Sequence, residues 1–280
     1  IQLPSIKSFY FLRKFEKKPD QKIGRLFLGF GDPILGGTAQ NRGSDSTRKR
    51  SSGSQSTSNN GNNAGDGIAN VRQISKMARL PGTAIELEAM RSALGAPMSN
   101  VVTGDTATER NLRATDLSNV KILALATHGV LAGEIEGVSE PGLIFTPPTK
   151  PDNQDDGILT ASEIAGLNLS ADWVILSACN TAAGDGSEGA PGLSGLARAF
   201  FYAGAKNLLA SYWPVRDDVA AKITVRTIEI ANDNQKLSRA EAFQAAMREI
   251  RNDTSADSDN DTWAHPNAWA PFTLIGDGAK

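Results

Sequence analysis

The sequence predicts an α/β fold in which a mostly parallel sheet lies between layers of helices. The first observation is that short apolar runs alternate with segments of helical periodicity, as in βαβ units. The second is that the runs 120–126 and 173–176 are apolar except for Lys121, as expected of strands buried on both faces. The third is that glycine and proline mark the ends of these segments.

The individual elements follow from the same patterns. Four helix starts show a Thr or Ser followed three residues later by Glu, the capping box that satisfies orphan backbone donors. The pairs are Thr83/Glu86, Thr106/Glu109, Thr160/Glu163 and Ser238/Glu241. We expect helices at 84–95, 107–115, 161–166, 191–204, 217–231 and 239–251. We expect strands at 26–30, 100–103, 120–126, 143–145, 173–178, 207–212 and 272–275.

Composition limits the classes of function. The chain has 280 residues and a net charge of −2, so it lacks the basic surface expected of a protein that binds nucleic acid directly. Its single cysteine cannot form an intrachain disulfide. It has no apolar run long enough to span a bilayer and no signal-peptide pattern. We therefore expect a cytoplasmic location and no membrane association.

One segment differs from the rest. Residues 36–70 are almost entirely Gly, Ser, Asn, Thr, Gln and charged residues, which cannot bury enough apolar surface to offset the entropy of ordering. We expect a disordered surface loop, and its Arg48-Lys49-Arg50 run is a candidate site of proteolytic cutting. The chain starts at Ile1, which we interpret as the start of a piece of a longer protein.

The candidate nucleophile is Cys179, which follows the apolar run 173–176 and precedes a glycine-rich stretch. His128 ends the run 120–126 in the same way. Open α/β sheets bind ligands at the carboxyl ends of their strands, so these two side chains could lie side by side. A histidine within reach activates a thiol, which predicts a Cys–His dyad. The amide of Gly129 could help to hold an oxyanion.

Other interpretations of these residues remain open. A lone cysteine is more often a small buried apolar side chain, and a lone histidine is more often a satisfied core or surface residue. His265 is a weaker candidate base, because it does not end a strand and no glycine follows it. No Cys/His cluster has metal-ligand spacing, so we expect neither a metal nor another cofactor.

The motifs LATHG (125–129) and VILSACNT (174–181) resemble the histidine and cysteine motifs of the CHAT-domain family, a bacterial branch of the caspase-like cysteine peptidases that is related to separase. The segments 31–33, 80–90, 107–113, 156–181, 192–218 and 265–278 are similar to the family pattern in the same order. The resemblance covers most of 1–280, with 38–70 the main exception, and implies one domain. One departure is Ala182, where relatives often have glycine.

The resemblance implies a caspase-like three-layer fold with helices on both faces and an antiparallel edge strand, here 272–275. It implies that His128 is the general base or ion-pair partner and that Cys179 forms a thioester acyl-enzyme with a protein or peptide substrate. It also implies that the amides of Gly129 and Cys179 hold the oxyanion. Tetratricopeptide repeats usually precede this domain, so we expect an upstream repeat region or a regulatory protein as partner.

The relationship to separase implies cleavage after a basic residue, with Arg favoured. Asp217 and Asp218 follow the strand after the cysteine strand, where an acid could hold a guanidinium, although either could simply cap the next helix. Asp156 could line the same pocket or be a plain loop acid. A preference for Asp would need a basic pocket, for which Arg216 and Arg198 are the candidates.

Two other functions compete with a cysteine endopeptidase. One is a catalytically silent caspase-like module that binds a partner protein, although both dyad residues are present. The other is an acyl-transfer enzyme such as a glutamine amidotransferase, whose nucleophile elbow usually carries glycines that are missing around Cys179.

Overall fold

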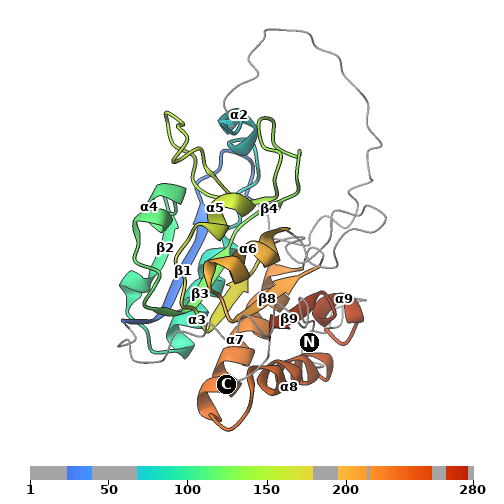
Figure 1. Cartoon of the computed structure of the whole chain (residues 1–280). Helices are drawn as coiled ribbons and strands as arrows, with labels where there is room; N and C mark the ends of the chain where they lie inside the picture. The colour runs from blue at the N-terminus through green and yellow to red at the C-terminus, as the bar shows by residue number, and fades with distance from the viewer. Residues whose placement is uncertain (1–23, 40–67, 179–194, 213–214, 254–262, 277–280) are drawn as a thin grey trace.

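The fold is a six-stranded sheet between layers of helices (Figure 1). The computed structural model describes residues 24–39, 68–178, 195–212, 215–253 and 263–276. Within them the strand order is β2-β1-β3-β7-β8-β9, with only β9 antiparallel to its neighbour. The strands are β1 (Arg25–Pro33), β2 (Val101–Gly104), β3 (Val120–Ala126), β7 (Trp173–Leu176), β8 (Asn207–Ser211) and β9 (Phe272–Gly276). The predicted α/β class and the antiparallel edge strand are confirmed.

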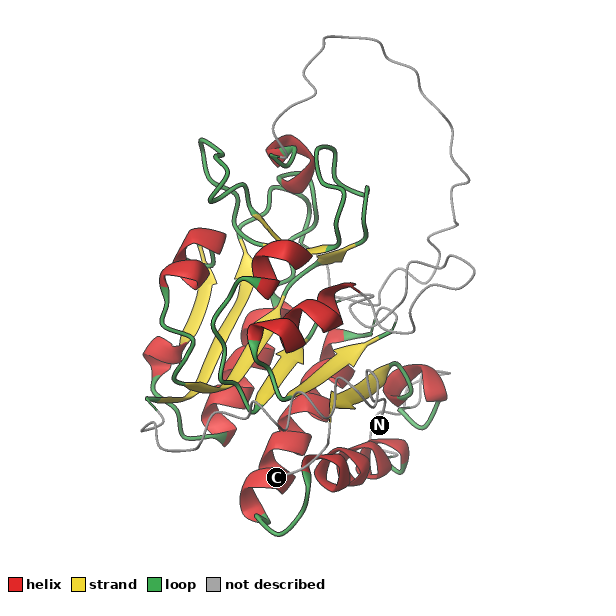
Figure 2. Ribbon diagram, in the orientation of Figure 1, coloured by secondary structure: helices red, strands yellow, loops and turns green. Residues whose placement is uncertain are grey.

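Side chains alternate between the two faces of the sheet because successive residues of a strand point in opposite directions. Leu28, Leu123 and Val174 pack in the core beneath α4 (Glu109–Ala114), α5 (Ala161–Ala165) and α6 (Gly195–Ala203). Phe27 and Ile122 pack in a second core against α3 (Gly82–Ala93), α7 (Asp217–Asp233) and α8 (Arg239–Arg251). Figure 2 shows these helix layers on the two sides of the strands. Burial on both faces explains why β7 is apolar throughout and β3 is apolar except for Lys121.

A second, three-stranded sheet was not predicted as a unit. It is antiparallel and consists of β4 (Gly129–Val130), β5 (Gly142–Ile144) and β6 (Ile158–Thr160). The sequence predicted only a strand at 143–145, because two- and three-residue strands are too short to show a period. Ile144 and Ile158 pack with Ile74 of α2 (Val71–Ile74) in a third small core. The remaining short helices are η1 (Met98–Asn100) and α9 (Pro266–Trp269).

Two of the four predicted capping boxes are correct. Thr160 and Ser238 each accept a hydrogen bond from the amide of the Glu three residues later, and that Glu bonds back to the cap residue. The other two boxes are wrong. Pro81 is the N-cap of α3, and Thr108 rather than Thr106 caps α4 by accepting from the Asn111 amide. The Thr83 hydroxyl instead accepts from the Asp32 amide, and the Thr106 hydroxyl donates to the Thr103 carbonyl.

The structure describes the two ends of the polar segment predicted at 36–70, namely residues 36–39 and 68–70. The amides of Gly36 and Gly37 donate to the carbonyls of Ser75 (2.7 Å) and Met77 (3.0 Å). Ala69 is buried, and its amide donates to Asp156 Oδ2 (2.7 Å). Both ends of the segment are therefore fixed to the body of the protein, and the expectation of disorder for 40–67 lies outside the described residues. No helix in the described ranges combines the length and the apolar composition needed to cross a membrane.

The turn between α6 and β8 depends on Gly204. Its φ is +113°, and a Cβ atom there would lie 2.3 Å from the Leu169 carbonyl oxygen. We expect Gly204→Ala to lower the free energy of unfolding by about 2–4 kcal/mol, since it adds backbone strain and a clash. Gly133→Ala is the matched control, because Gly133 has a φ of +78° but open space around its Cβ position. Urea unfolding of both variants measures the difference, and equal losses would contradict the role of the clash.

Candidate active site

The backbone of His128 is fixed directly after the end of β3. Thr127 is buried, and its hydroxyl donates to the Ile144 carbonyl (2.6 Å). The Ile144 amide in turn donates to the His128 carbonyl (2.9 Å). The small sheet therefore holds the chain on both sides of the His128 peptide and brings the side chain to the carboxyl edge of the large sheet.

The imidazole ring of His128 is oriented by a backbone carbonyl. Its Nε2 atom lies 2.6 Å from the carbonyl oxygen of Ala78. A carbonyl oxygen only accepts hydrogen bonds, so Nε2 must carry the proton. In the neutral ring, Nδ1 is then the nitrogen that can accept a proton. This arrangement suits a general base.

The residues that lead to Cys179 are also held by hydrogen bonds. The Ser177 amide donates to the Leu125 carbonyl (2.9 Å), which extends the β3–β7 pairing beyond the strand itself. The Ala178 carbonyl accepts from the Ser211 hydroxyl (2.9 Å) at the end of β8. These contacts fix the two residues before the predicted nucleophile, whereas Cys179 itself lies outside the described residues.

Sequence reasoning missed the environment of Glu86. It was predicted as part of a capping box, but its side chain is fully buried on the inner face of α3. Its carboxylate accepts from the hydroxyls of Ser177 (2.8 Å) and Thr224 (3.1 Å). The signal was available, because Glu86 shares a helix face with Leu87 and Met90. Glu86 thus ties α3 and α7 to the end of the cysteine strand.

The predicted oxyanion donor Gly129 pairs with Leu143 in the small sheet. The bond from the Ile144 amide to the His128 carbonyl makes Gly129 and Leu143 a pair of the non-hydrogen-bonded type. In such a pair the glycine amide points away from the neighbouring strand. The Gly129 N–H is therefore not used by the β4–β5 ladder and is oriented to serve another acceptor.

The acidic candidates for substrate binding lie in two different places. Asp217 begins α7, and its side chain lies outside the described residues. Asp218 is exposed, and its carboxylate oxygens accept hydrogen bonds from Arg216 Nε (3.1 Å) and Nη2 (2.7 Å). No side chain caps α7 at Arg216. His265, the weaker candidate base, is exposed just before α9, which packs against α8.

Asp156 has a different environment from the other two acids. One carboxylate oxygen accepts from the Ala69 amide (2.7 Å) and the other from the Ile158 amide (3.1 Å). Burial raises the pKa of Asp156 above its usual range. These bonds hold the start of β6 and the end of the 36–70 segment, so the structure gives Asp156 a supporting role that the pocket prediction did not anticipate.

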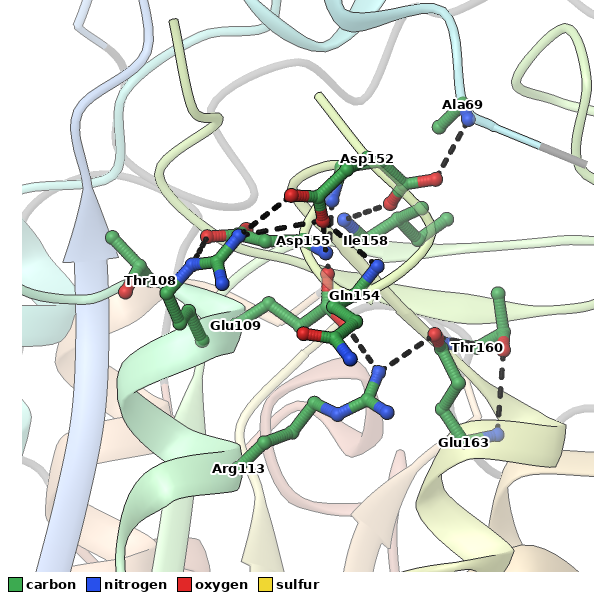
Figure 3. A network of polar contacts seen from close by, with 12 residues as sticks. Ala69, Thr108, Glu109, Arg113, Asp152, Gln154, Asp155, Ile158, Thr160 and Glu163 are labelled. Atoms are coloured by element: carbon green, nitrogen blue, oxygen red, sulfur yellow. Dashed lines mark hydrogen bonds and ion pairs between the residues drawn. The ribbon is translucent and has the colours of Figure 1, made fainter. Parts of the chain in front are cut away.

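Glu109 belongs to a network of charged groups (Figure 3). Its carboxylate accepts from the Asp156 amide (3.1 Å) and from Arg113 (2.8 Å), which also contacts Glu163 (2.9 Å). Glu109 is only 1% exposed, and this burial raises its pKa to about 7 despite the bond to Arg113. The network joins α4, α5 and the loop before β6. Among the described residues, no group of three or more Asp, Glu, His or Cys side chains could hold a metal ion.

The fold and the site together define a class. A mostly parallel six-stranded sheet with an antiparallel edge strand, and with a histidine at the carboxyl end of a central strand, is consistent with the caspase-like α/β fold. The family model of the CHAT domain matches residues 20–277. The chain therefore belongs to the CHAT-domain family, as its motifs suggested.

Two curated relatives are similar over part of the chain. Tetratricopeptide repeat protein 28 of Mus musculus is 32% identical over 149 residues, which is 53% of this chain and 5% of the relative. The Homo sapiens protein of the same name is 30% identical over 123 residues, which is 44% of this chain and 4% of the relative. The chain thus spans only a small part of these relatives. Both are mammalian, so their similarity does not support the bacterial origin that the resemblance implied.

The buried Glu109 carboxyl predicts a pH-dependent stability. Its folded pKa of about 7 lies above the ordinary 4.5, so the folded protein binds this proton more tightly than the unfolded chain. The resulting stabilisation is complete below pH 4.5 and is lost as the pH rises through 7. We expect the free energy of unfolding of the parent, relative to Glu109→Gln, to fall by on the order of 3 kcal/mol between these values. Urea unfolding from pH 4.5 to 8 measures this, and parallel profiles would contradict it.

Proposed function

We propose that this protein is a cysteine endopeptidase in which His128 activates Cys179. The observation that carries the proposal is the fixed His128 ring at the end of β3, the strand that pairs with the strand leading to Cys179. Ile122 pairs with Trp173 and Leu125 with Leu176, and His128 and Cys179 have the same sequence separation as each of these pairs. If the parallel register continued beyond β3 and β7, His128 and Cys179 would lie opposite each other.

The proposed chemistry follows from the groups at this edge. The Cys179 thiol gives its proton to His128 Nδ1, and the thiolate attacks the scissile carbonyl carbon. The Gly129 amide, with that of Cys179, donates to the oxyanion that forms. His128 then gives the proton to the leaving amine, and a thioester remains. Water, deprotonated by His128, attacks the thioester and releases the acid and the thiol.

The alternative is a catalytically silent module that binds a partner protein. It is supported by the name of the two relatives, which describes repeats and no peptidase activity. The family membership and the orientation of His128 favour the enzyme, because a silent module has no need of an imidazole whose Nε2 proton is fixed. An upstream tetratricopeptide-repeat region or a regulatory protein is the partner that we propose for either function. A cytoplasmic location is likewise a proposal.

Substitution of the dyad tests the proposal. We expect Cys179→Ala to abolish cleavage of a peptide library and to leave the fold intact, since a small residue replaces another at a strand end. We expect His128→Ala to lower kcat by about 10³-fold, because the thiol loses its base. Activity is measured with purified protein alongside circular dichroism. Cleavage that persists in Cys179→Ala would contradict the assignment, and equal inactivity of the folded parent would favour the silent module.

We further propose that cleavage occurs after Arg. The exposed Asp218 carboxylate already takes the guanidinium of Arg216 through two contacts, so it has a geometry that an incoming arginine could use. Lysine presents a point charge and would be held less well. Asp217, next in the chain, shares this proposal. The same ion pair engages both residues, so a substrate arginine would have to replace Arg216 on Asp218, just as a substrate aspartate would have to replace Asp218 on Arg216 in the alternative basic pocket.

Matched fluorogenic peptides test this specificity. We expect a preference for Arg over Lys before the cut, and a loss of about 10- to 100-fold in kcat/KM for Arg peptides in Asp217→Ala or Asp218→Ala, the value of one charge-assisted hydrogen bond. Asp156→Ala completes the series, and we expect it to lower stability rather than change the preference. Cleavage after Asp or Leu with none after Arg would reject the proposal.

A further inference from the structure

Asp32, at the end of β1, has an unusual backbone. Its φ of +44° is the only positive value of a non-glycine residue among the residues that the structure describes. The β1–β2 register also shifts between Gly31 and Pro33, which marks a bulge at Asp32. Aspartate enters this region at a cost, and such strain and bulges concentrate near functional sites, where they redirect a side chain.

The carboxylate of Asp32 holds Arg79 in a bidentate ion pair. Oδ1 accepts from Arg79 Nε and Oδ2 from Nη2, both at 2.8 Å. The Asp32 side chain is 7% exposed, and that of Arg79 is 39% exposed. The Asp32 amide also donates to the Thr83 hydroxyl (2.9 Å). Two parallel bonds between a guanidinium and a carboxylate fix direction as well as distance.

Arg79 directly follows Ala78, whose carbonyl oxygen is the acceptor for His128 Nε2. The peptide of Ala78 is supported from both sides. Before it, the Met77 carbonyl accepts from Gly37, whose backbone bridges to Ala78. After it, the Leu80 carbonyl accepts from the Thr83 hydroxyl (2.7 Å). The Arg79 side chain adds the contact that ties this segment to β1.

We propose that Asp32 and Arg79 are a positioning pair that fixes the Ala78 carbonyl and, through it, the orientation and the proton position of the His128 ring. The proposal rests on the proposed peptidase function and adds a supporting layer to it. A functional histidine needs its second nitrogen held by a stable acceptor, as in metal and triad sites. If the Ala78 carbonyl were mobile, water would compete with it for the Nε2–H group of His128.

A structural role alone would have a different consequence. If the pair only stabilised the end of β1, its loss would lower global stability and leave the local bond of His128 Nε2 intact in the folded state. Arg110 offers the matched comparison, because it also pairs with a buried aspartate, Asp155, through a contact of 3.3 Å. Asp155 is 4% exposed. It contacts Arg110 and Asp152, so this ion pair belongs to a different network from that of Ala78 and His128.

The experiment follows the imidazole N–H proton by ¹⁵N-resolved NMR in Arg79→Gln and Arg110→Gln. The chain has only two histidines, so His265→Gln assigns the remaining ring to His128. We expect the Nε2–H proton of His128 to exchange with water about 10-fold faster in Arg79→Gln than in the parent, as expected for local loss of a bond worth on the order of 1 kcal/mol. In Arg110→Gln we expect the parental rate.

Kinetics provide the second readout. We expect kcat of Arg79→Gln to fall about 10- to 100-fold with a smaller change in KM, since misplacement of a catalytic group affects the chemical step. Arg79→Lys should lie between Gln and the parent, because lysine keeps the charge but loses the fork. Arg110→Gln should keep the parental kcat. If Arg79→Gln does not fold, Asp32→Asn is measured against the same criteria.

A parental exchange rate in Arg79→Gln, or the same acceleration in Arg110→Gln, would overturn the positioning role. These results can be separated from failure of the proposed function. An inactive parent would remove the peptidase proposal, while the NMR comparison would still decide whether the pair fixes the His128 ring. An active parent with unaffected variants would keep the peptidase and reject the pair.

Discussion

The parallel pairing of β1, β3 and β7 is the constraint on which the rest of the structure depends. Buried backbone groups must find partners, and in this core they do so by aligning three strands in one direction. Their carboxyl ends then meet at one edge, where β1 carries Asp32 next to its last residue, β3 leads to His128 and β7 leads to Ser177 and Ala178. The chain order of the strands reverses between β1 and β3, which is where open α/β sheets form their ligand sites.

The polar groups at this edge are each held by backbone or by buried partners. His128 contacts a carbonyl, Ser177 contacts a buried carboxylate, and Thr127 contacts the small sheet. Such contacts cost little reorganisation when chemistry occurs, because the donors and acceptors are already oriented. The small sheet, which has only short strands, is important for this reason: it fixes the chain on either side of His128 and redirects the Gly129 amide.

The charged network around Glu109 is a second organising feature. It joins α4, α5 and the loop before β6, and Asp156 within it anchors Ala69. A buried carboxyl with a raised pKa is tolerated there because Arg113 and the Asp156 amide each donate to one of its oxygens. Asp156 therefore resembles a structural acid more than a substrate ligand, and its place in the sequence alone could not reveal this.

The sequence by itself determined the chain order of the strands of the large sheet and of the longer helices, because apolar runs and helical periods depend on local spacing and burial. It also singled out His128 and Cys179, since each follows a buried strand, and the family motifs around them are specific. Only the tertiary structure decided the partners: the Ala78 carbonyl for His128, the burial of Glu86, the pairing of Asp32 with Arg79, and the replacement of Thr106 by Thr108 as a cap. These contacts join residues that are distant in sequence or compete locally, and a pattern of spacing carries no information about which polar groups meet when the layers pack.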